Sequence, residues 1–127
     1  MYTHITVGTN DDVKAKQFYD AVFGALGANP GMHDPEKGRI AYAHNNGMFM
    51  VTKPINGEPA SHANGGTIGF AVESPEQAAA WHAAGVANGG TTCEDPPGVR
   101  ELPFGKLYLA YLRDPDGNKL CTMFRMG

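Results

Sequence analysis

The sequence predicts an α+β domain made of two copies of one strand–helix–strands module. An alternating, β-branched segment at 3–8 precedes an acidic helix start, and a similar segment at 66–72 precedes a second one. The offset from His4 to Thr67 is about half of the 127-residue chain. An internal repeat dictates architecture, and neither half is large enough to bury a core alone. We therefore expect two modules packed together, with a pocket framed by equivalent positions of both.

Length, charge and cysteine usage limit the classes of function. At 127 residues the chain is one compact domain. Its net charge is −3 and its lysines and arginines are dispersed, so we expect no nucleic-acid partner. No apolar run approaches the roughly 20 residues of a membrane span, so we expect no membrane partner. The chain opens without a signal-peptide pattern, and Cys93 and Cys121 form no disulfide framework, which favours a cytoplasmic location.

The first module begins with a strand over 2–8 and continues with a helix. Asn10 and Asp11 are suitable N-cap residues, and acidic side chains suit the positive end of a helix dipole. The helix carries an apolar stripe near helical spacing and ends at Gly27. The stripe consists of Val13, Phe18, Val22, Phe23 and Leu26.

Three short strands complete the first module, which spans about 1–55. We expect them over 29–33, 39–44 and 48–53. Gly38 and the Asn45-Asn46-Gly47 sequence supply the turns, because Asn-Gly is a strong hairpin signal. Residues 54–65 form the linker between the modules.

The second module, over about 66–127, repeats this order. After the strand at 66–72, Ser74-Pro75-Glu76-Gln77 places a capping serine before a proline at the first helical position. The helix continues through Trp81 and ends at Asn88-Gly89-Gly90. Strands are expected at 91–94, 106–113 and 119–125.

Two connections in the second module differ in character. The turn at 114–118 has a physical basis, because Pro115 presets one backbone dihedral and Gly117 accepts a positive φ. The segment 95–105 is rich in proline, and we predict that it is irregular.

The period of two along a strand separates two kinds of sheet face. One set is mostly bulky and apolar and suits packing against helices: Ile5, Val7, Phe49, Val51, Ile68, Phe70, Val72, Leu120, Thr122 and Phe124. The opposite set mixes small, polar and sulfur-containing residues: Tyr2, His4, Thr6, Met48, Met50, Thr52, Thr67, Gly69, Ala71, Cys121 and Met123. Small residues leave space and methionines form an adaptable lining, so a sheet curled around this face would enclose a ligand cleft. If both faces are buried, the chain is instead a simple sandwich.

Three motifs occur in an order that resembles a known superfamily. The chain opens with Thr3-His4-Ile5-Thr6-Val7, has Phe18-Tyr19 on a helix that ends near Gly24, and has Arg113-Asp114-Pro115-Asp116-Gly117-Asn118 before its final strand. This pattern resembles the vicinal-oxygen-chelate superfamily, the glyoxalase/bleomycin-resistance/dioxygenase group, over the whole chain. The resemblance implies two βαβββ modules that form an incomplete, barrel-like curled sheet with the helices outside. It also implies a small-molecule cleft and a homodimer.

In metal-dependent members of this superfamily, the first and last strands of each module hold a divalent ion. Carried over, the four ligand positions fall on His4, Met50, Thr67 and Cys121. Of these four residues, only His4 is the usual ligand type at its position. Hard divalent ions need oxygen ligands, and Met50 supplies none. Zinc would need help from His44, Tyr108 or a partner chain, whereas a His, Met and Cys set would suit Cu(I). We therefore expect no metal and no other cofactor.

Eight residues are the candidate ligand-binding residues: His4, Thr6, Met48, Met50, Thr67, Tyr108, Cys121 and Met123. His4 is the best candidate for a catalytic base, and the alternative is a hydrogen-bonded pocket histidine. Cys121 is either a nucleophile or a buried structural thiol. Arg100, Lys106 and Arg113 either recognise an anion or lie on the solvated surface.

Three functions are consistent with these residues. The first, which we predict, is a bleomycin-resistance-like protein that binds a mainly apolar small molecule and lacks the usual metal centre. The second is a metal-dependent glyoxalase-like lyase or isomerase, or a dioxygenase, in which the ion holds vicinal oxygens of the substrate. The third is a cofactor-free isomerase or lyase that uses His4. A fold alone does not choose among them, because function resides in sites.

Overall fold

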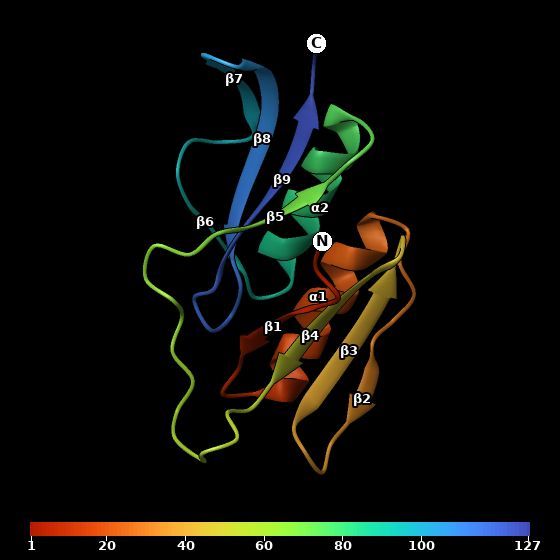
Figure 1. Ribbon diagram of the computed structural model, residues 1–127, viewed down its shortest axis with the longest axis vertical. Helices are drawn as coiled ribbons and strands as arrows, with labels where there is room; N and C mark the ends of the chain where they lie inside the picture. Colours follow the sequence, from red (N-terminus) through yellow and green to blue (C-terminus); the bar gives the residue numbers. More distant parts are fainter.

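The computed structural model describes residues 1–127 as two helices and two mixed sheets. The first module contains β1 (Ile5–Gly8), α1 (Asp12–Ala25), β2 (Met32–Asp34), β3 (Arg39–His44) and β4 (Gly47–Thr52). The second contains β5 (Ile68–Ala71), α2 (Pro75–Ala87), β6 (Thr91–Thr92), β7 (Gly98–Leu102), β8 (Gly105–Arg113) and β9 (Lys119–Arg125). Figure 1 shows one sheet at each end of the molecule, with α1 and α2 in contact near the middle.

The two sheets share one topology. Their strand orders are β1-β4-β3-β2 and β5-β9-β8-β6, and β7 also pairs with β8. In each sheet the first strand runs parallel to the last strand of its module, and the other pairs are antiparallel. The predicted α+β fold of two βαβββ modules is confirmed, with β7 as an additional strand in the second, and neither sheet closes into a barrel. As a result, β1 and β5 are both edge strands.

Side-chain caps fix where each helix begins. The Asp11 carboxylate accepts a hydrogen bond from the backbone N–H of Lys14 at 3.1 Å. Ser74 accepts one from the N–H of Gln77 at 3.1 Å, and the Gln77 side chain accepts one from the N–H of Glu73 at 2.8 Å. The second helix therefore starts with a variant of the capping box, in which the Gln77 side chain bonds to the residue before the Ser74 cap. Neither helix is long and apolar enough to cross a membrane.

The main core lies between the helices and the sheets. From α1 it receives Phe18, Tyr19, Val22 and Phe23, all of which are buried. Val13, which the sequence placed on the same stripe, is 68% exposed, so this prediction is wrong. The buried positions of α1 recur at intervals of three and four residues and therefore form one face of the helix. Because a helix turns by about 100° per residue, Val13 points away from that face.

A glycine sets how closely the second helix approaches its neighbours. A Cβ atom at Gly85 would lie 2.3 Å from Cδ1 of Leu112 on β8 and 3.2 Å from atoms of both Phe18 and Val22 on α1. Only a residue without a side chain fits at this crossing. Gly85 thus lets α2 pack against both its own sheet and the helix of the other module.

The predicted strand ends need several corrections. The first strand starts at Ile5 and not at residue 2. The strand expected at 29–33 is shorter and lies further along the chain, at Met32–Asp34. The strand expected at 91–94 ends after Thr92, since Glu94 adopts a positive φ of 57°, which an extended strand does not allow.

The segment 95–105, predicted to be irregular, contains a strand. Residues 98–102 form β7, which pairs antiparallel with β8 through a hairpin at Pro103-Phe104. Its prolines precede or follow the paired residues and leave the ladder intact, so the proline-rich composition was misleading here. This hairpin protrudes at the upper end of the molecule (Figure 1).

The 114–118 turn joins the two modules. The Asp114 carboxylate accepts four hydrogen bonds, from the N–H groups of Asp116 and Asn118, the Asn118 amide and the Tyr19 hydroxyl, at 2.6–2.9 Å. The Asn118 amide also donates to the carbonyl of Gly8 at 3.0 Å. Burial raises the pKa of Asp114, and burial beside this carboxylate raises the pKa of Tyr19 well above its usual value. Because Tyr19 and Gly8 belong to the first module, the turn binds one module to the other.

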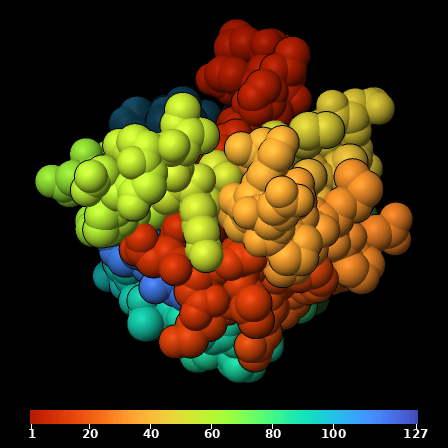
Figure 2. Space-filling model, turned by 90° about the horizontal axis from the view of Figure 1, so that it is seen from below, coloured from red at the N-terminus to blue at the C-terminus, as the bar shows by residue number.

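The linker is held against the first module by a paired contact. The Asn10 side chain accepts a hydrogen bond from the N–H of Ala60 at 2.7 Å and donates one to its carbonyl at 3.2 Å. Figure 2 shows the linker, in yellow-green, lying beside the first module in red. Asn10 therefore positions the linker, and Asp11 alone caps α1.

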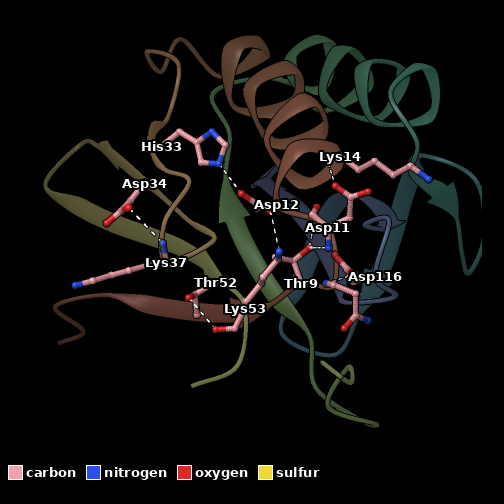
Figure 3. A network of polar contacts seen from close by, with 11 residues as sticks. Thr9, Asp11, Asp12, Lys14, His33, Asp34, Lys37, Thr52, Lys53 and Asp116 are labelled. Carbon is pink, nitrogen blue, oxygen red and sulfur yellow. Dashed lines mark hydrogen bonds and ion pairs between the residues drawn. The ribbon is translucent and has the colours of Figure 1, made fainter. Parts of the chain in front are cut away.

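A carboxylate at the start of α1 ties together three parts of the first module. Asp12 lies 2.7 Å from Nε2 of His33 on β2 and 3.5 Å from Nζ of Lys53 after β4. Both side chains point toward Asp12 in Figure 3. The hydrogen bond from His33 is the main cause that lowers the pKa of Asp12.

Candidate ligand-binding site

An apolar cavity lies at the seam between the modules, and we call it the seam cavity. Its volume is about 250 Å³. The walls come from the first module, including the end of α1 and the β3–β4 hairpin, and from β5 of the second: Ile5, Phe23, Leu26, Ala28, Tyr42, His44, Asn45, Gly47, Met48, Phe49, Ile68, Gly69, Phe70 and Ala71. A 150 Å³ apolar cavity is known to bind benzene, so this one has room for a somewhat larger molecule.

Aromatic rings from both modules form one wall of the seam cavity. Phe70 of β5 packs edge-on against Phe23 of α1 and Phe49 of β4, with ring centroids 5.2 and 5.6 Å apart. Tyr42 belongs to the same wall, but its hydroxyl already donates to the Asp20 carboxylate at 2.7 Å. Burial and this carboxylate raise the pKa of Tyr42. The wall is therefore an apolar aromatic surface without a free hydroxyl.

A second, polar hollow of about 290 Å³ adjoins the seam cavity. Three hydroxyl side chains contribute to what we call the polar hollow: Thr6, Ser61 and Thr67. Ile68 lines both the seam cavity and the polar hollow, so the two spaces share one lining residue. Both spaces lie along the edges of β1 and β5, each of which has only one neighbouring strand.

Strand register groups some of the predicted site residues. On the first sheet, Thr6 pairs with Met50 and shares its face, and Met48 lies two residues before Met50. On the second sheet, Cys121 pairs with Gly69, and Met123 pairs with Ala71. The sequence-based division of each strand into two faces therefore agrees with the observed register.

The other predicted residues lie elsewhere. His4 precedes β1, is exposed, and is hydrogen-bonded through Nδ1 to the Thr3 hydroxyl at 2.9 Å. Tyr108 pairs with Phe124 on the face that packs toward the main core, opposite to Cys121 and Met123.

Of the eight candidates, three line the two spaces. Met48 lines the seam cavity, and Thr6 and Thr67 line the polar hollow. The remaining five line neither space: His4, Met50, Tyr108, Cys121 and Met123.

Four residues of the seam cavity, Ile5, Phe49, Ile68 and Phe70, belong to the set that the sequence assigned to packing against helices. Phe49, Ile68 and Phe70 belong to the bulky apolar set, and Ile68 and Phe70 are only partly buried. A ring that packs on a helix and a ring that lines a cavity have the same pattern in sequence. The one available signal was the internal repeat, because Ile5 and Ile68 open the equivalent first strands of the two modules.

The four positions to which the family resemblance assigns metal ligands, His4, Met50, Thr67 and Cys121, do not form a donor set. No group of three or more His, Cys, Asp and Glu side chains lies close enough together to hold a metal ion. Met50 and Thr67 supply a thioether and a hydroxyl, which are weak ligands for divalent ions. Burial raises the pKa of Cys121, so its thiol stays protonated near neutral pH and is a poor ligand and nucleophile.

The cationic candidates for anion recognition are engaged within the protein. Arg100 donates to the carbonyls of Asp95 and Pro96, and Arg113 donates to the carbonyl of Gly117 at 2.7 Å. Lys106 lies 3.6 Å from the carboxylate of Glu101. These side chains organise the loops around β8.

The fold and the seam together define the class of this protein, an α+β protein in which two βαβββ modules pack around a shared apolar seam. The chain belongs to the Glyoxalase/Bleomycin resistance protein/Dioxygenase superfamily, whose family model matches residues 2–122. Comparison with curated proteins gives no match.

Several solved structures share this architecture. A glyoxalase/bleomycin resistance protein from Albidiferax ferrireducens T118 is 58% identical, with a TM-score of 0.93 over 98% of this chain and 99% of that chain. A glyoxalase-related enzyme from Fulvimarina pelagi is 23% identical, with a TM-score of 0.74 over 98% and 88% of the two chains. Lactoylglutathione lyase from Agrobacterium tumefaciens is 21% identical, with a TM-score of 0.67 over 97% and 92%. The last two likenesses concern the fold alone.

Proposed function

We propose that this protein binds a small, mainly apolar molecule in the seam cavity and that binding needs no metal ion. The observation that carries the proposal is the composition of the cavity, since ten of its 14 lining residues are hydrophobic and both modules contribute. Ligand sites are typically apolar concavities with a few polar groups at their margin. Here His44 and Asn45 supply those groups.

The proposal of metal-free binding rests on donor chemistry. Divalent metal centres in proteins use carboxylates, imidazoles and thiolates, in sets of three or more. The seam cavity contains a single residue of these types, His44. An apolar ligand would instead be held by contact with aromatic rings and with the flexible side chain of Met48.

We also propose that the protein is a homodimer. β1 and β5 are unpaired edges of four residues each, and unpaired edges are usually covered in stable proteins. A two-fold partner would cover both edges at once and close the open side of the seam, and two-fold dimers are the commonest assemblies. Sedimentation at micromolar concentration should give a dimer mass, and a monomer mass would contradict this part of the proposal.

A cavity-filling variant tests the binding proposal. Ala28 follows α1, lines the seam cavity and is only partly buried, so Ala28→Leu should occupy part of the cavity. The matched control is Ala83→Leu, an exposed position of α2 that does not line the cavity. With 2-naphthol as the probe in titration calorimetry, we expect Ala28→Leu to weaken binding at least tenfold and Ala83→Leu to leave it unchanged. Equal affinities for both variants, or no binding of 2-naphthol to the unmodified protein, would contradict the proposal.

Metal titration separates this proposal from the glyoxalase-like or dioxygenase alternative. Zn²⁺, Ni²⁺ and Mn²⁺ should produce no stoichiometric heat of binding and no change in the affinity for 2-naphthol. Methylglyoxal–thiol adducts should not turn over in the presence of these ions. Metal-dependent turnover that is lost in His4→Ala would establish the alternative, a glyoxalase-like lyase or isomerase.

A further inference from the structure

We infer that the ligand is amphiphilic, with an apolar body in the seam cavity and an uncharged, hydroxyl-bearing head in the polar hollow. This inference rests on the proposed function, because it describes the polar head of the same ligand whose apolar body occupies the seam cavity. It is carried by three features of the structure: the adjacency of the two spaces along β1 and β5, the hydroxyl residues that line the polar hollow, and the local balance of charge.

The two spaces follow each other along the same pair of strands. On β1, Ile5 lines the seam cavity and the next residue, Thr6, lines the polar hollow. Just before and within β5, Thr67 lines the polar hollow, Ile68 lines both spaces and Gly69 lines the cavity. Val7, two residues after Ile5 and on the same face of β1, also lines the polar hollow, and residues two apart on a strand are separated by about 6.6 Å. A molecule that extends by this length along the edges of β1 and β5 contacts both spaces.

The polar hollow offers hydroxyl groups for hydrogen bonding. Thr6, Ser61 and Thr67 are all exposed, and they come from β1, the linker and the start of β5. A hydroxyl group both donates and accepts, so three of them suit a head group that does the same. The Asn118 amide is not free for this purpose, because it donates to the Gly8 carbonyl and the Asp114 carboxylate.

The charge around the polar hollow is balanced. Lys119 is the one charged residue that lines it, and its ammonium group is bonded to the Glu94 carboxylate. This carboxylate is the main cause that raises the pKa of Lys119. The lining therefore offers an anionic head no unpaired cation and a cationic head no carboxylate, which favours an uncharged head.

Three probes with one tail and different heads test the inference: hexyl β-glucoside, hexyl sulfate and hexyltrimethylammonium, each below its micelle-forming concentration. A six-carbon tail fits within the 250 Å³ cavity, because benzene, which also has six carbons, already binds in an apolar cavity of 150 Å³. Calorimetry should show that the glucoside binds at least tenfold more tightly than either charged probe. Equal or tighter binding of a charged probe would overturn the inference.

Variants of the hydroxyl residues provide a second readout. Thr67→Val keeps the side-chain shape and should weaken the glucoside about three- to tenfold, as expected for one lost hydrogen bond, while the binding of 2-naphthol stays the same. Ser61→Ala should also weaken the binding of the glucoside. Because Ser61 lies in the linker, this substitution does not alter a strand. The control Thr91→Val lies on β6, is exposed, and lines neither space. If neither Thr67→Val nor Ser61→Ala weakens the glucoside more than the control does, the inference is wrong.

The two proposals fail in different ways. If 2-naphthol binds and Ala28→Leu weakens its binding, but the glucoside binds no more tightly than the charged probes, only the amphiphile inference fails. If neither 2-naphthol nor any hexyl probe binds, the proposed function itself fails.

Discussion

The two modules have the same topology but fill their interiors in different ways. In the first, α1 buries three aromatic rings, Phe18, Tyr19 and Phe23, and additional rings come from the sheet. In the second, α2 buries Ala78, Trp81 and Gly85, so its backbone lies closer to its sheet. The repeat therefore preserves the path of the chain and not the packing. Ring-rich packing in the first module meets β5 of the second, in which Ile68 and Phe70 alternate with the small residues Gly69 and Ala71, and the seam cavity lies at this junction.

The largest effect should come from breaking the contact that joins the modules. Asp114→Ala removes an acceptor of four hydrogen bonds and leaves the buried Tyr19 hydroxyl and the Asn118 amide without this partner. Leaving buried polar groups unpaired costs about 1–3 kcal/mol each, so we expect the free energy of unfolding to fall by about 3 kcal/mol. Urea denaturation measures this change. A loss smaller than about 1 kcal/mol would show that the turn does not join the modules energetically.

A pair of glycine substitutions compares the two helices directly. Gly85→Ala places a Cβ atom 2.3 Å from Leu112 within a packed core, and we expect a loss of about 1–3 kcal/mol from overpacking. Gly24→Ala on α1 meets no atom within 4 Å and should stabilise the protein by about 0.5–1 kcal/mol through helix propensity. Thermal unfolding of both variants gives the signs. The same sign for both would contradict the difference in packing described here.

A smaller, pH-dependent effect is expected within the first module. Since the pKa of Asp12 is lowered in the folded protein, its contribution to stability is present above the unfolded value of about 3.9. This contribution is lost as the pH falls through the lowered folded value. Asp12→Asn should therefore reduce the free energy of unfolding by about 1–2 kcal/mol at pH 5–6, and the difference from the unmodified protein should shrink below pH 4.

The exposed residue Asp34 provides the control for this pH effect. Asp34→Asn changes a carboxylate that accepts only a local hydrogen bond from Lys37, so we expect a change within about 0.5 kcal/mol at every pH. A constant difference between Asp12→Asn and the unmodified protein from pH 6 to pH 3 would show that the contact with His33 is not the source.

The contrast between the modules also explains what the sequence could predict. Helix starts and hairpin turns depend on residues that are neighbours in the sequence, so Asp11, Ser74 and the Asn-Gly turn suffice to locate them. Strand faces follow from the period of two along each strand. Strand β7 was missed because its pairing with β8 depends on tertiary contact, and its flanking prolines suggested a loop.

The site was harder to predict than the fold. Sequence periodicity places Phe49 and Phe70 on the buried face, and it contains no information about whether a neighbouring ring fills the space beside them. The predicted candidates Thr6, Met48 and Thr67 lie beside the seam because they come from the first and last strands of the first module and from the start of the second. Met123 and Cys121 share a sheet face with β5 residues but lie one strand further away.

The central claim is that both modules contribute to one ligand site at the seam. The most direct measurement is a nuclear magnetic resonance titration with 2-naphthol that follows the methyl groups of Ile5 on β1 and Ile68 on β5, with Leu107 on β8 as an internal control outside the cavity. Our account predicts saturable shifts of both isoleucine signals with one common dissociation constant, while the Leu107 signal stays in place. Shifts confined to one module, or no saturable shift at either isoleucine, would contradict it.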